Sequence, residues 1–141
     1  MQRIVEQDLP GNLEEATKQA VWTWNKDEIA WRYCSATHSI SKVRFTGERW
    51  VIVNIMSSMK IYQFETLSST RDCGTDKITH DSEEAFFETL EETRDHALKN
   101  IDKLIAYNTK CLTDNKDDIF KYCITEMTYT REVLTEKTNS L

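Results

Sequence analysis

The sequence predicts an α+β fold with a short N-terminal helix, an antiparallel four-stranded meander and a C-terminal antiparallel pair of long helices packed on the sheet. Two observations lead to this prediction. Apolar residues recur at helical spacing near the N-terminus, at a period of two in the middle of the chain, and at helical spacing again towards the C-terminus. The length of 141 residues is also that of one domain with its own hydrophobic core, so we expect a single domain over residues 1–141.

The first helix is expected over residues 12–24. Asn12 is a suitable N-cap, and Glu14 and Glu15 in the first turn complement the positive end of the helix dipole. Trp22 falls on the side opposite the apolar residues, where it either packs against the next element or is an exposed contact for a partner. The apolar side is formed by Leu13, Ala16, Ala20, Val21 and Trp24.

The middle of the chain has the pattern of four short strands. β-Branched and aromatic residues dominate there, and turn signals at 46–48 (Thr-Gly-Glu) and 57–58 (Ser-Ser) separate the runs. Residues 51–55 are apolar at four of five positions, so we expect that strand to be central and covered on both faces. The expected strands are residues 29–34, 42–45, 50–56 and 60–64.

Helical spacing returns after a polar stretch at residues 67–81. Asp81, with Glu84 three residues later, has the pattern of a capping box and predicts a helix over residues 82–110. Asp114 is expected to cap a second long helix. The first helix has an apolar stripe of Phe87, Leu90, Ala97, Leu98, Ile101, Leu104 and Ile105. The stripe of the second helix is Ile119, Phe120, Cys123, Ile124, Met127 and Leu134.

The net charge of −6 lies entirely in the second half of the chain. Residues 1–70 carry equal numbers of basic and acidic residues, whereas residues 71–141 carry ten basic and sixteen acidic residues. A general nucleic-acid binder needs a basic surface, so direct nucleic-acid binding is not expected. No apolar run approaches the roughly 18 residues of a membrane span, and the N-terminal residues lack the apolar part of a secretory signal. We therefore expect no membrane association and a cytoplasmic location, which is the host cytoplasm if the source is viral.

The sequence contains none of the common cofactor or catalytic motifs. Its three glycines form neither a P-loop nor a dinucleotide fingerprint, and there is no G-x-S-x-G or H-E-x-x-H pattern. The four cysteines contain no C-x-x-C pair. Cys34 and His38 together with Cys73 and His80 offer zinc-ligand residue types, but their spacing fits no compact zinc site. We therefore expect no cofactor and no metal, and the sequence argues against an enzyme.

Acidic residues near the start of the first long helix lead to the main functional expectation. A negatively charged face attracts a protein partner with a basic surface and accelerates the encounter between them. We therefore expect a small acidic interaction protein that binds a macromolecular partner and inhibits it by covering its surface. The two long helices can pack within one chain or be shared between two copies, so a homodimer is an alternative. The candidate partner-binding residues are Glu84, Glu88, Glu91, Glu92, Asp95 and Trp22.

Two alternatives use other residues. Basic and aromatic side chains interleave on the meander, and a sheet with this composition holds nucleotides by stacking and charge. A nucleotide-like small ligand is therefore the first alternative. The second is a small hydrolase built on residues 67–81, with Cys73 as the nucleophile and His80 as the base. The candidate ligand-binding residues of the first alternative are Arg32, Arg44, Trp50, Arg71 and His80.

The low glycine and proline content, the acidic balance and the compact α+β plan resemble those of accessory proteins of large DNA bacteriophages. This resemblance implies an intracellular protein that acts by binding a host macromolecule, for instance to counter a defence.

Overall fold

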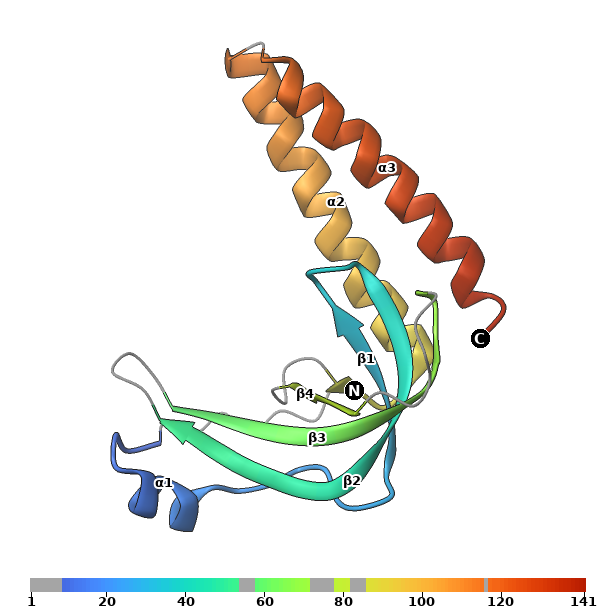
Figure 1. Cartoon of the computed structure of the whole chain (residues 1–141). Helices are drawn as coiled ribbons and strands as arrows, with labels where there is room; N and C mark the ends of the chain where they lie inside the picture. Colours follow the sequence, from blue (N-terminus) through green and yellow to red (C-terminus); the bar gives the residue numbers. More distant parts are fainter. Residues whose placement is uncertain (1–8, 54–57, 72–77, 82–85, 116) are drawn as a thin grey trace.

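The computed structural model describes residues 9–53, 58–71, 78–81, 86–115 and 117–141. It has the predicted α+β fold class, with a short N-terminal helix, an antiparallel meander and two long C-terminal helices (Figure 1). The helices are α1 (Leu13–Gln19), α2 (Leu90–Asn115) and α3 (Asp118–Thr138). The strands are β1 (Ile29–Cys34), β2 (Ser39–Val53), β3 (Ser58–Ser69), β4 (Ile78–Asp81) and β5 (Phe86–Phe87).

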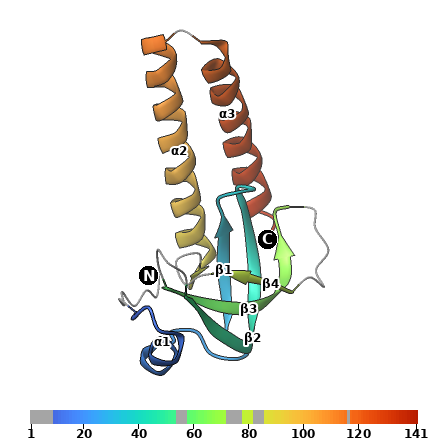
Figure 2. The same cartoon turned by 60° about the vertical axis from the view of Figure 1, so that its left-hand side comes forward.

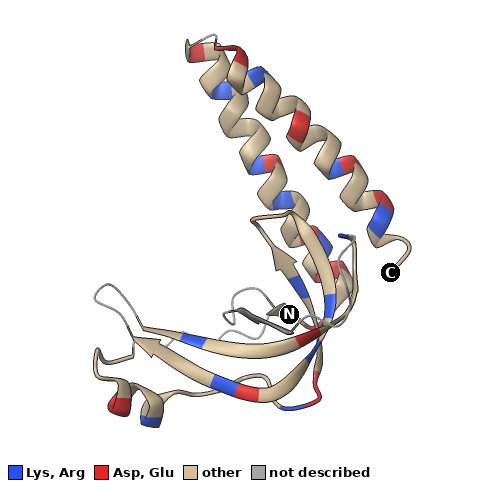
Figure 3. Ribbon diagram, in the orientation of Figure 1, with Lys and Arg blue, Asp and Glu red and all other residues tan. Residues whose placement is uncertain are grey.

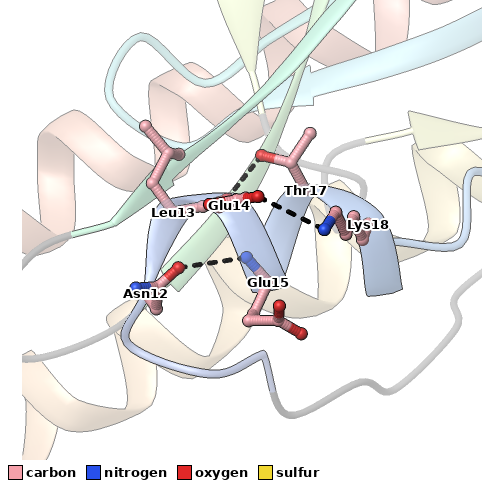
Figure 4. Close-up of polar contacts among 6 residues, drawn as sticks. All are labelled: Asn12, Leu13, Glu14, Glu15, Thr17 and Lys18. Atoms are coloured by element: carbon pink, nitrogen blue, oxygen red, sulfur yellow. Dashed lines mark hydrogen bonds and ion pairs between the residues drawn. The ribbon is translucent and has the colours of Figure 1, made fainter.

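Helix α1 begins at the predicted cap but is shorter than predicted. The Asn12 side chain accepts a hydrogen bond from the backbone N–H of Glu15 at 3.1 Å, and Lys18 pairs with Glu14 at 3.3 Å (Figure 4). The helix ends at Gln19 and not at residue 24. The chain then runs extended, because the N–H groups of the following segment have another acceptor in the Tyr62 hydroxyl.

The Tyr62 hydroxyl fixes the segment between α1 and β1. It accepts the backbone N–H of Thr23 at 2.9 Å and that of Trp24 at 3.0 Å. Two further side chains of the sheet hold the same segment: Arg49 donates to the Trp24 carbonyl at 3.3 Å, and Lys60 donates to the Val21 carbonyl at 2.7 Å. These contacts replace the helical hydrogen bonds that the sequence pattern predicts.

The five strands of the described chain form one sheet in the order β4-β3-β2-β1-β5, and every pair is antiparallel. Strands β1 to β4 are neighbours in chain order, so the sheet contains a four-stranded antiparallel meander as predicted. The strands themselves differ from the prediction: residues 42–45 and 50–53, expected in two strands, both lie in β2, and β4 lies in the polar stretch 67–81, where no strand was expected.

The short strand β5 joins the sheet beside β1, where Phe87 pairs with Trp31 and Phe86 with Arg32. The sequence pattern placed residues 86 and 87 inside the helix expected over residues 82–110, which is wrong.

The turn predicted at residues 46–48 does not exist. Strand β2 runs through these residues, and its pairing with β3 shifts register between Phe45 and Arg49, which is a β-bulge. Gly47 lies in the bulge with φ of +96°, a conformation that glycine adopts without strain. The same residues that signal a turn therefore allow one long, bent strand. The expected cover on both faces at residues 51–55 is also wrong, because Ile52 is 44% exposed.

The sheet buries side chains on both of its faces. Successive residues of a strand point to opposite faces, and in β1 and β2 Ala30 and Val43 join one core while Tyr33 and Ile40 join another. The first core comprises Trp24, Ala30, Val43, Phe45, Tyr62, Phe64 and Phe86, with Trp22 packed against it. The second comprises Tyr33, Ile40, Ala97, Ile101 and Leu134, with Trp31, Leu90, Ile105 and Met127 packed against it.

Each core has its own cover. The segment between α1 and β1 covers the first core, where the Trp24 ring stacks on Phe45 at 5.2 Å between centroids and Phe45 meets Phe86 edge-on at 4.8 Å. Such aromatic pairs contribute about 0.5–1.5 kcal/mol each beyond the area they bury. The pair of helices covers the second core through buried residues near the start of α2 and the end of α3.

The two long helices start later than the sequence pattern predicts. Asp81 is the last residue of β4 and does not cap a helix. The capping interaction occurs at Thr89, whose hydroxyl accepts the N–H of Glu92 at 3.2 Å and contacts the Glu92 carboxylate at 3.2 Å. Asp117, not Asp114, caps α3 by accepting the N–H of Ile119 at 3.0 Å.

Helices α2 and α3 form an antiparallel hairpin that projects from the sheet (Figures 1 and 2). Only its base packs on strands: α2 contacts β1, β2 and β5, and α3 contacts β2. An ion pair between Arg131 and Asp102 at 2.8 Å joins the two helices. The remaining length of the hairpin, which we call the arm, extends beyond the sheet, so its side chains pack only on each other or face solvent.

We expect Gly47→Ala to lower the free energy of unfolding by about 1–2 kcal/mol, because a Cβ at positive φ is strained. An added Cβ would also lie 3.0 Å from the Cβ of Lys26. Gly11→Ala is the matched control, since nothing lies within 4 Å of a Cβ there and its φ is not in the left-handed region. Urea unfolding of both variants tests the bulge, and equal stability of the two would contradict it.

We expect Tyr62→Phe to destabilise the protein by about 1–3 kcal/mol, because two backbone N–H groups lose a common acceptor. Tyr62 is 1% exposed, so water does not readily replace the hydroxyl. Tyr122→Phe removes the same atom from a side chain that is 65% exposed and is expected to change stability by less than about 0.5 kcal/mol. Thermal unfolding of the pair measures the difference.

Candidate functional site

The predicted acidic residues lie at the base of the hairpin, beside the sheet. Glu91 and Glu92 are in the first turn of α2, Asp95 follows one turn later and Glu88 precedes the helix. The Glu92 carboxylate contacts the Thr89 hydroxyl and so takes part in the helix cap. Glu84 lies outside the described residues. These side chains therefore complement the dipole of α2 as well as contributing negative charge.

Trp22 is partly buried and contacts the first core. Its ring meets Tyr62 edge-on at 5.3 Å, and the Arg49 guanidinium lies 5.1 Å from its centre. Of the two roles left open by the sequence, the structure shows packing against the next element. Trp22 is therefore less accessible to a partner than the arm.

A second apolar stripe runs along the side of α3 that faces away from the seam with α2. It consists of Ile119, Tyr122, Tyr129 and Val133, which we call the outer stripe. Spacings of three, seven and four residues place these side chains on one side of a helix. Ile119 is 59% exposed, Tyr122 65% and Tyr129 66%, so large apolar surfaces face solvent along the arm.

The sequence analysis missed the outer stripe. It assigned Ile119 to the buried stripe of the second helix, but the seam with α2 is made by other residues of α3. Phe120, Cys123, Ile124 and Met127 are partly buried there, and Leu134 is buried. The same spacing rule applied to the opposite side of the helix would have found the outer stripe, since a helix with apolar residues on two sides is expected to have two neighbours.

A cavity lies where the base of the hairpin meets the β1–β2 turn and the end of β3. Its volume is about 220 Å³, and ten residues line it. Arg71 at the end of β3 and Lys137 in the last turn of α3 are its two cationic residues, and none of the described lining residues is acidic. Five of the other lining residues carry hydroxyl groups: Thr37, Ser39, Thr70, Tyr129 and Thr130.

His38 is held in this cavity by a chain of hydrogen bonds. Asn100 of α2 donates to the Tyr33 hydroxyl at 3.1 Å, and that hydroxyl lies 2.8 Å from His38 Nδ1. Nδ1 therefore either accepts the Tyr33 hydroxyl proton, with the imidazole proton on Nε2, or donates its own proton to that hydroxyl. His38 also has φ of +50°, an uncommon conformation for a residue with a side chain.

Burial and hydrogen bonds shift the pKa values of His38, Tyr33 and Cys34. Burial lowers the pKa of His38 and raises the pKa of Tyr33, so both groups are neutral near pH 7. Burial also raises the pKa of the Cys34 thiol, but hydrogen bonds from Thr37 and Ala36 outweigh it and leave that pKa below its ordinary value. The His38 imidazole therefore acts as a neutral hydrogen-bond donor and acceptor.

The candidate ligand-binding residues of the meander have separate contacts. Arg44 forms an ion pair with Glu65 at 2.7 Å, and the Arg32 guanidinium lies 5.2 Å from the centre of the Phe64 ring. Trp50 lies on β2 beyond the bulge. Arg71 lines the cavity at the hairpin base, and His80 lies in β4, paired with Gln63. The contacts of Arg32, Arg44 and Arg71 described here are with different partners, so a shared ligand site for these residues stays a prediction.

The other sequence hypotheses concern metal, thiol and membrane chemistry. Among the described residues, no group of three or more histidine, cysteine or acidic residues is placed to hold a metal ion. Cys34, Cys111 and Cys123 are free thiols, and Cys73 lies outside the described residues. No helix in the described ranges combines the length and apolar character needed to cross a membrane.

We expect the stability of the protein to fall as the pH decreases below about 6.5, the ordinary pKa of histidine. The native pKa of His38 is lower, so the unfolded state binds the proton first and stability is lost as the pH falls towards the native value. Urea unfolding between pH 7 and 5.5 measures this slope.

His38→Asn is expected to reduce the slope, because asparagine tolerates the left-handed backbone but does not titrate. His96 has a pKa lowered by partial burial and by Lys103 and Lys99, so it retains a contribution of the same sign. An unchanged slope in His38→Asn would show that this imidazole is equally protonated in both states.

Comparison of the chain with protein-family models, with curated proteins and with solved structures finds no significant match. The fold and the surfaces described above are therefore the basis for a functional proposal.

Proposed function

We propose that this chain is an interaction protein that binds a protein partner with a basic surface along the outer stripe of α3. The observation that carries the proposal is the exposure of large apolar side chains on an arm that projects from the folded sheet. Folding of the chain itself does not require Ile119, Tyr122 and Tyr129 to be apolar, since each of these side chains is more than half exposed.

The residue types of the outer stripe suit protein recognition. Tyrosine combines a large apolar ring with a hydroxyl, loses little conformational freedom on binding and is enriched in interfaces. Tyr122 and Tyr129 are spaced by two helical turns, so a partner groove of ordinary length contacts both. Ile119 and Val133 extend the contact at either end. A helix face of this kind is a compact, rigid docking element.

The charges around the outer stripe favour a basic partner. Lysine, arginine and acidic residues are distributed along both helices of the arm (Figure 3). Arg131 is already paired with Asp102, which leaves fewer cations than carboxylates on α3. Glu126 lies one turn from both Tyr122 and Tyr129, within the stripe itself. Together with Glu91 and Asp95 near the base, these carboxylates support the acidic character on which the sequence-based expectation rests.

Binding through the arm requires no catalytic group on this chain. A rigid hairpin docked on a partner prevents other molecules from reaching the same surface, which is the steric inhibition expected from the sequence. Negative charge increases the association rate, and burial of the tyrosine rings slows dissociation.

We expect the double variant Tyr122→Ser, Tyr129→Ser to lose its partner while keeping its fold. Each exposed aromatic anchor typically contributes about 1–2 kcal/mol, so affinity is expected to fall by about a hundredfold or more. Wild-type and variant protein are immobilised side by side in lysate of the source cells, and the captured proteins are quantified by mass spectrometry. A protein retained equally by both is not the proposed partner, and if every captured protein behaves so, the proposal is wrong.

Leu13→Ser is the matched control, because it removes a side chain of similar exposure, 57%, from α1 at the other end of the molecule. It is expected to capture the same partner as the wild type. Raising the salt concentration is expected to weaken capture, since exposed charges are screened. Light scattering of the purified chain provides a further check: a stable dimer that the double variant abolishes would identify a second copy as the occupant and overturn the proposal of a basic partner.

A further inference from the structure

We propose that the cavity at the hairpin base binds a small phosphate monoester, with the phosphate between Arg71 and Lys137. This site shares Tyr129 and Val133 with the outer stripe, but it does not depend on the function proposed for the arm. It also differs from the sheet-based ligand site predicted from the sequence, with which it shares only Arg71.

The first argument is the convergence of two cations. Arg71 follows β3, and Lys137 lies in the last turn of α3, so only the tertiary structure brings both to one cavity. In the described part of the chain neither side chain forms an ion pair. A lysine near the C-terminus of a helix is ordinary by itself, because it complements the helix dipole. An arginine that lines the same cavity adds a second positive charge, and an anion bound between the two would interact favourably with both.

The second argument is the supply of neutral donors beside these cations. The Thr70 hydroxyl oxygen accepts the backbone N–H of Ile40 at 3.0 Å, which leaves its proton free to donate. His38 contacts the Tyr33 hydroxyl through Nδ1, and in the tautomer in which Nδ1 accepts that hydroxyl proton, Nε2 is a second neutral donor. A phosphate has several acceptor oxygens, and the two cations and the two neutral donors match them in kind. A carboxylate ligand has fewer oxygens with which to accept hydrogen bonds from the two cations and the two neutral donors.

The third argument is size and the nature of one wall. Pockets for drug-sized ligands measure about 300–1,000 Å³. The cavity is smaller, at about 220 Å³, which suits a phosphate with a small organic group and not a whole dinucleotide. Tyr129 and Val133 line the cavity on the side of α3. These apolar surfaces accommodate the organic group of the ester, so an aromatic ester is expected to bind more tightly than inorganic phosphate.

The test is a titration of the full chain with inorganic phosphate and with phenyl phosphate, followed by NMR at constant ionic strength. We expect shifts of the backbone amides of Thr70, Arg71 and Lys137 and of the His38 ring, with dissociation constants of about 1 mM or below for phenyl phosphate. Bound phosphate is also expected to raise the pKa of His38, since a nearby anion favours the protonated imidazole. Absence of these shifts, or equally tight binding of phenol, would overturn the proposal.

Arg71→Gln and Lys137→Gln are each expected to weaken phenyl phosphate binding by about tenfold or more, because each removes a charge-assisted hydrogen bond. Both side chains belong to exposed residues, so the fold is expected to persist, and circular dichroism confirms it. Lys121→Gln is the matched control, since it removes the same charge from the far end of α3. If Lys121→Gln weakens binding as much as Lys137→Gln, the effect is one of net charge and the cavity is not the site.

Discussion

The alternation of side chains along β1 and β2 is the constraint on which the rest of the structure depends. Because Ala30 and Val43 point to one face while Tyr33 and Ile40 point to the other, a single sheet supports two separate cores. One core requires the extended segment with Trp24 as its cover, and the other requires the hairpin base. A shift of register by one residue in either strand would exchange the faces and uncover both cores.

This arrangement also explains why the arm is exposed. Buried residues of α2 and α3 close to the sheet, such as Ala97, Ile101 and Leu134, complete the second core. Beyond these residues, α2 and α3 pack only on each other, so each helix buries one side and exposes the other. The outer stripe of α3 is therefore left in solvent by geometry, and the cavity with Arg71 and Lys137 forms where α3 returns to the sheet.

Much of the fold could be predicted from the sequence, because periodicity and capping act over a few residues. The N-cap at Asn12, the first strand over 29–34 and the antiparallel long helices follow from such local patterns. The errors occur where local signals are ambiguous. A glycine at positive φ suits a turn or a bulge equally, and only pairing with β3 decides in favour of the bulge at Gly47. Of the candidate sites, the acidic residues at the base of α2 were named from the sequence and their role stays a prediction, whereas the outer stripe and the cavity were not identified from the sequence.

The sequence by itself determined the fold class, the net negative charge and the absence of common catalytic motifs, because composition and spacing within one element are sufficient for each. Tertiary structure decided which distant groups meet. The Tyr62 hydroxyl ends α1 early by accepting N–H groups from the following segment, and α3 brings Lys137 to Arg71. The physical reason is that such contacts depend on how complete elements pack, and the spacing of residues along the chain carries no record of that packing.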